Sequence, residues 1–184
     1  MSPGHLILVV GASSAGKSTL CRALQDGLDE PFLHFSPDVF LFGPGVLPGR
    51  RDDGGPFAWE KMRPHVFEGF FRCLPALLSA GNNLLVDCIV ESREQMSRLL
   101  ELLAPFDVFF VGLHCPLPEL ERREVARGDR RIGDARRDFE TVHTFGEYDL
   151  EIDSTDPLDR NVQTVIAAWK ARRRPSAFER MAAG

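Results

Sequence analysis

The sequence predicts an α/β protein with a mainly parallel, five-stranded sheet covered by helices on both faces. One observation is the regular alternation of short apolar runs with segments of helical periodicity along the chain. The other is the turn at residues 11–18, which fits the pattern G-x-x-x-x-G-K-[ST]. This pattern is typical of the phosphate-binding loop (P-loop) between a strand and a helix. We therefore expect the three-layer αβα sandwich of P-loop NTPases and kinases, with a helical, arginine-rich lid.

The expected strands are short and almost continuously apolar, which favours burial on both faces of a parallel sheet. They lie at residues 6–10, 32–35, 84–88 and 108–113, with a weaker one at 150–152. Helical patterns between them predict helices at residues 17–28, 64–80, 93–103, 118–127, 134–142 and 161–173. Gly81 after the second helix, Ser92 before the third and Pro175 after the last act as stop and start signals.

Length and composition indicate one globular domain over residues 1–184. The net charge of −5 argues against a nucleic-acid-binding surface. The four cysteines form no C-x-x-C pair, so we expect reduced thiols rather than disulfides or a metal cluster. No signal peptide and no apolar run of about 18 residues is present, which predicts a cytoplasmic protein without a membrane partner. The oligomeric state stays open, a homo-oligomer included.

The P-loop is expected to bind a nucleoside triphosphate. Backbone N–H groups of the loop and the N-terminus of the following helix would supply hydrogen-bond donors to phosphate. Lys17 would reach the β- and γ-phosphates, and Ser18 would bind Mg²⁺. The alternative, an ordinary glycine-rich turn, is disfavoured because strand, loop, Lys-Ser pair and helix all agree. The expected nucleotide-binding residues are Gly11, Ala12, Ser13, Ser14, Ala15, Gly16, Lys17, Ser18 and Thr19.

Two aspartates follow predicted strands, at the sheet edge where parallel α/β proteins bind their ligands. Asp38 could accept a proton from a substrate hydroxyl or orient it, or it could cap a turn or helix after Pro37. Asp87 ends an apolar strand, a pattern typical of the Walker B carboxylate that holds Mg²⁺ directly or through water. The alternative for Asp87 is a carboxylate in a turn that pairs with arginine or serine.

Arginines cluster between residues 122 and 137, inside the segment 118–142 that we interpret as the lid. Arg127 and Arg130 flank a Gly-Asp break, and there they could bind phosphate oxygens as the lid closes and excludes water. For Arg122 and Arg131 we favour a solvated helix face in which Glu121 and Glu124 pair with the arginines.

The segment at residues 39–80 is the expected acceptor-binding region. Its loop at residues 42–57 is long and rich in Gly and Pro, which favours a substrate-facing lid. The helix-spaced aromatics Phe67, Phe70 and Phe71, together with Trp59, are expected mainly in the core, with some able to line the acceptor pocket. His143 and Tyr148 are expected to be structural.

Taken together, these residues resemble the chloramphenicol phosphotransferase-like family of P-loop small-molecule kinases. The resemblance rests on Gly11-Ala12-Ser13-Ser14-Ala15-Gly16-Lys17-Ser18, Asp38, Val111-Gly112-Leu113-His114-Cys115, Arg123-Glu124-Val125-Ala126-Arg127-Gly128-Asp129-Arg130, His143 and Glu147-Tyr148-Asp149-Leu150-Glu151-Ile152-Asp153-Ser154-Thr155. It spans nearly the whole chain and is poor at residues 41–77. This sequence departs from the family's pattern after the third strand, where the family has an Asp-Asp pair and this chain has Asp87-Cys88.

The resemblance implies ATP- and Mg²⁺-dependent phosphorylation of a hydroxyl group, with Lys17 and Ser18 on phosphate and magnesium. It also implies Asp38 as the catalytic base, and Arg127 and Arg130 near the nucleotide phosphates. The expected partners are a nucleoside triphosphate and a small-molecule hydroxyl acceptor, with a chloramphenicol-like antibiotic among the candidates.

The leading hypothesis is therefore an enzyme, an ATP-dependent O-phosphotransferase. The alternatives are a metabolic or nucleotide kinase of the same fold and, in a different class, an NTP-hydrolysing switch or nucleotide sensor. The sequence contains no Asn-Lys-x-Asp motif of guanine-specific switches. The preference for ATP over GTP and the biological role, antibiotic resistance among the options, stay open.

Overall fold

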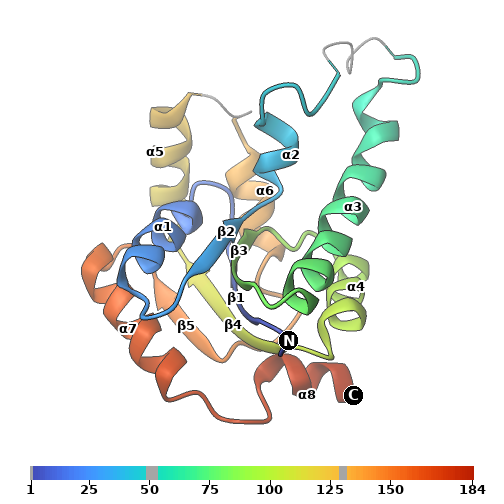
Figure 1. Ribbon diagram of the computed structural model, residues 1–184. Coiled ribbons are helices and arrows are strands. Elements are labelled where there is room, and N and C mark those ends of the chain that lie inside the picture. The colour runs from blue at the N-terminus through green and yellow to red at the C-terminus, as the bar shows by residue number, and fades with distance from the viewer. Residues whose placement is uncertain (1, 49–53, 129–131) are drawn as a thin grey trace.

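The computed structural model describes residues 2–48, 54–128 and 132–184. Within these ranges the chain contains five strands and eight helices (Figure 1). The strands are β1 His5–Val10, β2 Phe32–Phe35, β3 Asn83–Cys88, β4 Asp107–His114 and β5 Leu150–Asp153. The helices are α1 Lys17–Gly27, α2 Asp38–Phe42, α3 Trp59–Ser79, α4 Arg93–Leu103, α5 Leu117–Arg127, α6 Asp134–Thr141, α7 Leu158–Lys170 and α8 Ala177–Ala183.

The strands form one parallel sheet in the order β2-β3-β1-β4-β5. The central strand β1 pairs with β3 and β4, and its register sets Val9 opposite Asp87 and Val10 opposite Gly112. The middle strands are buried along nearly their whole length, as expected for a sheet covered on both faces. The predicted fold class, a five-stranded parallel α/β sandwich, is confirmed.

Helices pack against both faces of the sheet. Figure 1 shows α1 and α7 on one side and α3, α4 and α8 on the other, in agreement with their contacts. The α5–α6 pair rises beyond the carboxyl ends of the strands, opposite α2 and the start of α3. The helices on the two faces bury a core that includes Phe70, Phe110 and Phe178.

The main differences from the predicted helices concern four elements. Helix α3 begins at Trp59, not at Pro64, and both Pro64 and Pro75 lie inside it, where each removes one backbone hydrogen bond without ending the helix. Helix α7 covers residues 158–170 rather than 161–173, and Arg172 beyond its end donates to Asp107. Of the two short helices, α8 was not predicted, and α2 was foreseen only in the alternative of a turn or helix after Pro37.

Helix α8 had a sequence signal. Ser176 and Glu179 form a capping box, in which the Ser176 hydroxyl accepts from the Glu179 N–H and the Glu179 carboxylate accepts from the Ser176 N–H. Its Phe178 is almost fully buried. The helix is only seven residues long, so its stability comes from this cap and from packing rather than from its own periodicity.

Candidate active site

The P-loop has the backbone conformation that phosphate binding requires. Ser14 and Gly16 both have positive φ, 65° and 97°, and alternating backbone conformations of this kind make a concave, anion-binding turn. Gly11 is packed so closely that an added Cβ would lie 2.5 Å from the Leu113 carbonyl oxygen. Helix α1 begins directly after the loop, at Lys17, so its first N–H groups have no partner inside the helix. The predicted P-loop residues therefore form a cradle that fits a chain of phosphates.

Lys17 is held at the floor of this cradle. Its side chain is only 8% exposed, and its Nζ donates to the Ala12 carbonyl oxygen at 2.8 Å. Burial lowers the pKa of Lys17, while Asp87 and Asp138 act in the opposite direction and favour the charged form. A buried ammonium beside a loop of N–H donors is suited to polyphosphate.

Ser18 and Asp87 come together as the sequence predicted. The Ser18 Oγ donates to Asp87 Oδ2 at 2.8 Å, although 69 residues separate them. Burial acts to raise the pKa of Asp87, but hydrogen bonds from His34 and Ser18 and the charge of Lys17 outweigh it, so the pKa is lowered and the carboxylate stays ionised. A hydroxyl and a carboxylate oxygen at this spacing are the hard donors that Mg²⁺ prefers, so the pair fits this ion.

Helices α5 and α6 are attached to the P-loop at two points. Arg123 of α5 donates to the Ala15 carbonyl oxygen at 3.1 Å and to the Ser154 carbonyl oxygen at 3.1 Å. On α6, the buried Asp138 accepts from the Ser13 N–H at 3.1 Å. Burial raises the pKa of Asp138, against the pull of Arg137. The sequence analysis predicted neither the Arg123 contact nor the Asp138 contact with the P-loop. Asp138 does share a buried helix face with Ala135, and a carboxylate on such a face indicates a buried polar contact.

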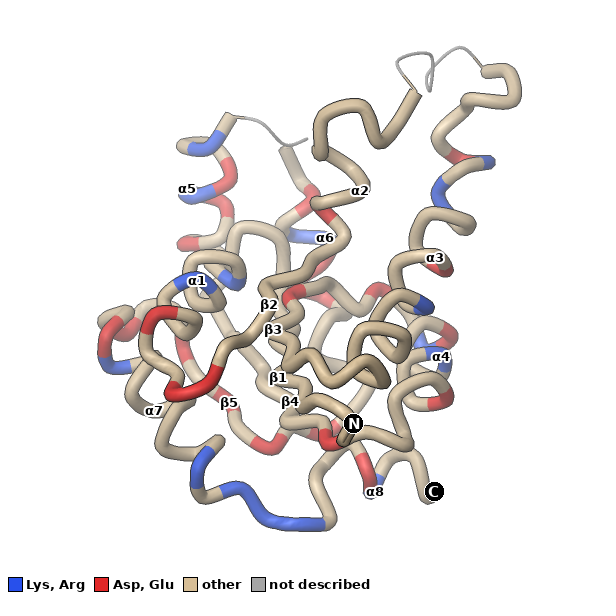
Figure 2. Tube along the Cα trace, viewed as in Figure 1, with Lys and Arg blue, Asp and Glu red and all other residues tan. Residues whose placement is uncertain are grey.

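The two lid helices are joined by a buried carboxylate. Glu124 of α5 is 2% exposed and accepts from the N–H groups of Gly133 and Ala135, at the start of α6. It therefore caps α6 and is buried, not on the solvated helix face that was expected, while Arg131, one of its two expected partners, lies outside the described residues. Glu121 does pair with an arginine, Arg136 of α6. Arg122 lies on an exposed helix face as expected, but its partner is Glu119 and not Glu121 or Glu124. Charged residues of both signs lie along α5 (Figure 2).

Of the two predicted lid arginines, Arg127 lies at the last residue of α5 and lines the cavity above the P-loop. Arg130 lies outside the described residues, as does Arg131. Residues 49–53 of the predicted substrate-facing loop are also outside the described ranges.

The central cavity, of about 190 Å³, joins the phosphate cradle to the predicted acceptor region. A helix does follow Pro37, but Pro37 is its N-cap residue and Asp38 is the first residue of α2, so Asp38 does not hold the capping position of the alternative. Asp38 lines this cavity together with Lys17, Ser18 and Asp87. The structure thus brings the predicted residues Asp38, Lys17, Ser18, Asp87 and Arg127 around one space.

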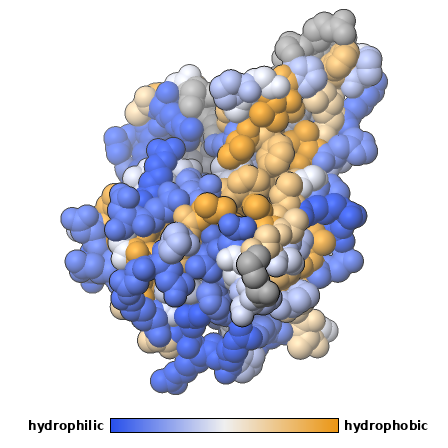
Figure 3. Space-filling model, in the orientation of Figure 1, coloured by the Kyte–Doolittle hydropathy of each residue, from blue (hydrophilic) through white to orange (hydrophobic). Residues whose placement is uncertain are grey.

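A second hollow of about 550 Å³ adjoins the central cavity and shares Leu41 and Phe67 with it. Trp59 and Phe67 line this hollow, whereas Phe70 and Phe71 belong to the core. Figure 3 shows apolar surface over α2 and the neighbouring part of α3. The exposed apolar side chains of this region include Val39, Phe42 and Val46.

The third hollow lies on the opposite side of the P-loop, with a volume of about 560 Å³. Arg123, Ser154, Leu158 and Asn161 line it beside Gly16. It is contiguous with the phosphate cradle and large enough for a nucleoside. The site as a whole therefore consists of a phosphate cradle between two hollows, an arrangement suited to holding two substrates against each other.

His143 and Tyr148, which were expected to be structural, contact each other beside His114. The Tyr148 OH lies 2.8 Å from His143 Nδ1, and the ring of His143 stacks on that of His114 with 3.9 Å between centroids. Neither residue lines the central cavity. The described cysteines are all free, in line with the prediction.

The sheet order, the P-loop between β1 and α1 and the attached helical pair define the fold of P-loop kinases. Solved structures agree on this fold. The APS kinase CysC of Mycobacterium tuberculosis, solved with AMPPNP and APS, superimposes with a TM-score of 0.68 at 20% identity, covering 92% of this chain and 99% of that one. A gluconokinase of Sinorhizobium meliloti 1021 superimposes with a TM-score of 0.59 at 18% identity, covering 92% of this chain and 93% of that one. The tunicamycin resistance protein of Deinococcus radiodurans superimposes with a TM-score of 0.59 at 16% identity, covering 89% of this chain and 94% of that one.

Sequence comparison names the family. Residues 4–170 match the chloramphenicol phosphotransferase-like proteins, and the chain belongs to this family. Candidate O-phosphotransferases of Mycobacterium tuberculosis, from strains CDC 1551 and H37Rv, are each 31% identical over 200 aligned positions, covering 98% of this chain and 89% of theirs. The predicted family is confirmed, and the chain is an enzyme of the phosphotransferase class. None of the described helices has both the length and the apolar character needed to cross a membrane.

Proposed function

We propose that the protein is an ATP- and Mg²⁺-dependent O-phosphotransferase that phosphorylates a hydroxyl group of a small molecule. The observation that carries the proposal is the convergence of Lys17, the Ser18–Asp87 pair and Asp38 on one cavity. This cavity lies between the phosphate cradle and a hollow lined by Leu41, Trp59 and Phe67 together with paired charged residues. A kinase needs this arrangement because the acceptor must meet the terminal phosphate in line.

Each residue has a distinct task in this proposal. Lys17 and the loop N–H groups neutralise and orient the phosphates, while Ser18 and Asp87 provide oxygen ligands for the metal. Asp38 orients the acceptor hydroxyl and accepts its proton. Arg127, and Arg130 from the sequence pattern, neutralise charge on the transferred group. When bound, Mg·ATP supplies the phosphoryl group and the metal charge that offsets its negative charge.

The charges around the second hollow, which Trp59 and Phe67 line and where the acceptor would bind, favour an uncharged acceptor. Arg63 is paired with Glu91, and Arg137 is paired with both Asp134 and Asp138. Arginines compensated in this way offer less attraction to a sugar acid or a nucleotide than unpaired ones would. This supports a neutral hydroxyl compound, a chloramphenicol-like antibiotic among the candidates, over the metabolic or nucleotide kinase alternative.

A transfer assay over a panel of hydroxyl compounds tests the proposal. The panel contains chloramphenicol, neutral sugars, aminoglycosides, sugar acids and nucleosides, and mass spectrometry detects an added phosphoryl group. We expect transfer to a neutral member that requires ATP and Mg²⁺. Asp38→Asn should lower kcat by about 10²–10⁴-fold, the usual contribution of a general base, while nucleotide affinity stays the same. Lys17→Ala, by contrast, should weaken productive use of the nucleotide.

Two results would contradict the proposal. Full turnover in Asp38→Asn would remove Asp38 from the reaction. Rapid phosphate release from ATP that no acceptor stimulates would favour the alternative of a nucleotide-hydrolysing switch.

A further inference from the structure

Asp87 uses both of its carboxylate oxygens inside the protein. Oδ2 accepts from Ser18 Oγ at 2.8 Å, and Oδ1 lies 2.5 Å from Nε2 of His34. The Asp87 side chain is 7% exposed and the His34 side chain 17%. The site thus contains a histidine that no sequence pattern indicated and that faces the oxygen turned away from Ser18.

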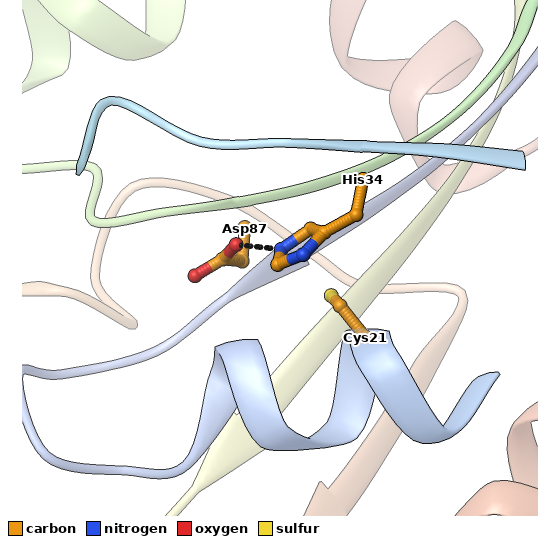
Figure 4. A group of neighbouring side chains, drawn as sticks. All are labelled: Cys21, His34 and Asp87. Carbon is orange, nitrogen blue, oxygen red and sulfur yellow. Dashed lines mark hydrogen bonds and ion pairs between the residues drawn. The ribbon is translucent and has the colours of Figure 1, made fainter. Parts of the chain in front are cut away.

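The sheet explains why His34 reaches Asp87. In the parallel pair β2–β3, His34 lies opposite Leu85. Because side chains alternate along a strand, Leu85 and Asp87 share one face of β3, and His34 lies on the same face of β2. Helix α1 packs on this face, and the thiol of its buried Cys21 lies near the imidazole (Figure 4). The ring is therefore placed by the sheet register on one side and by α1 on the other.

We propose that His34 is a positioning residue for the metal-linked carboxylate: by binding Asp87 Oδ1 it directs Oδ2 to Ser18 and to Mg²⁺. This inference rests on the proposed function. A nearly buried carboxylate whose Oδ1 lost its partner would carry an unsatisfied acceptor and would rotate to find another. Hydrogen bonds to the groups that hold a metal typically change metal affinity by about 10–100-fold.

The neighbouring side chains leave this task to His34. His34 does not line the central cavity among the described residues, so it acts through Asp87 and not on substrate. Cys88, the next residue on β3, is buried. Because side chains alternate along a strand, its thiol and the Asp87 carboxylate point to opposite faces of the sheet.

The side chains of Cys21, His34 and Asp87 offer a sulfur, a nitrogen and an oxygen atom within 4.8 Å of one another. These are also the kinds of atom that bind zinc. The direct contact between His34 Nε2 and Asp87 Oδ1 argues against that use, because an ion between them would have to separate the two atoms. A zinc site is therefore an outcome that the experiment must be able to detect.

The experiment measures the affinity for ATP with Mg²⁺ and with EDTA, by calorimetry, in wild type, His34→Leu and His34→Gln. The Mg²⁺-dependent gain in affinity isolates the metal site, whereas affinity in EDTA reports the P-loop alone. We expect His34→Leu to reduce the gain about tenfold and to leave affinity in EDTA within about twofold. The Gln amide nitrogen falls near the position of Nε2, so His34→Gln should restore most of the gain.

Steady-state kinetics give the second readout. In the transfer assay, the Mg²⁺ concentration for half-maximal rate should rise about tenfold in His34→Leu. The matched control is His5→Leu, because His5 Nδ1 also pairs with a partly buried aspartate, Asp107 at 3.0 Å, on strands β1 and β4. This control should leave the Mg²⁺ dependence unchanged.

Three results would overturn the inference. One is an unchanged Mg²⁺-dependent gain in His34→Leu. Another is an equal loss with and without Mg²⁺, since a general structural defect would produce it. The third is stoichiometric zinc in purified wild type that both Cys21→Ser and His34→Leu remove. Failure of wild type to bind Mg·ATP at all would instead contradict the proposed function, so the two failures are distinguishable.

Discussion

At the scale of single residues, the site depends on buried charges that are each satisfied by a specific partner. Lys17 bonds to Ala12, Asp87 to Ser18 and His34, and Asp138 to Ser13 and Arg137. Leaving any of these groups without a partner would cost more than the hydrogen bond itself contributes. The site is therefore organised before any ligand arrives, which favours catalysis by positioning.

His143 makes the stability of the fold depend on pH. Burial, and then the neighbouring His114, lower the pKa of His143 to about 4, while Glu151 acts in the opposite direction. Between pH 6.5 and 4 the unfolded chain binds a proton that the folded chain does not. The stabilising contribution of neutral His143 is thus fully present above pH 6.5 and is lost as the pH falls toward 4.

Urea unfolding at pH 7.5 and pH 5 measures this effect. We expect wild type to lose about 1 kcal/mol from His143 at pH 5, a value discounted because the ring is partly exposed. His143→Asn keeps a hydrogen-bonding group near Nδ1 but does not titrate, so it should show a smaller loss. The exposed His65→Asn serves as the control, and equal pH dependence in all three proteins would contradict the assignment.

At the scale of elements, α5 and α6 form a helical pair joined by the buried carboxylate of Glu124 and, at the surface, by the Glu121–Arg136 pair. Glu124 binds two N–H groups at the start of α6, a helix whose N-cap residue, Gly133, has no side chain to do so. Arg123 connects α5 to the P-loop, and Asp138 connects α6 to it. Movement of either helix should therefore be transmitted to the phosphate cradle.

Glu124→Ala tests this element directly. Removal of the carboxylate leaves two N–H groups without their acceptor, so we expect a loss of about 1–3 kcal/mol in the free energy of unfolding. The Michaelis constant for ATP should also rise, because α6 carries Asp138. Glu121→Ala is the matched control, since the half-exposed Glu121–Arg136 pair should contribute less than about 1 kcal/mol. A similar loss in both variants would refute the capping role.

At the scale of the whole molecule, chain order and spatial order diverge. Strand β1 occupies the centre of the sheet, and the last helix returns to cover β4. Asp149 connects β4 to α8, because its Oδ2 accepts from the Phe110 N–H of β4 and its Oδ1 accepts from the Ala177 N–H of α8. The carboxyl-terminal helix is therefore part of the core and not an appendage.

Phe178→Ala should show this in thermal or urea unfolding. Phe178 is 1% exposed and packs edge-on against Phe110 with 5.8 Å between ring centroids. Its truncation should cost about 3–5 kcal/mol, as for other buried phenylalanines. Val125→Ala, at a position 64% exposed, should change stability by less than about 0.5 kcal/mol. A loss below 1 kcal/mol in Phe178→Ala would mean that α8 detaches readily.

The alternation of strands and helices and the P-loop could be read from the amino-acid sequence, because both depend on local periodicity and on turn chemistry over a few residues. Lys17, Ser18 and Asp87 were predicted in this way. The partners that come from distant parts of the chain could be seen only in the folded molecule. His34 reaches Asp87 across 53 residues, Arg123 reaches Ala15 across 108, and Asp138 reaches Ser13 across 125. Such contacts follow from strand order, register and helix packing, which no local pattern encodes.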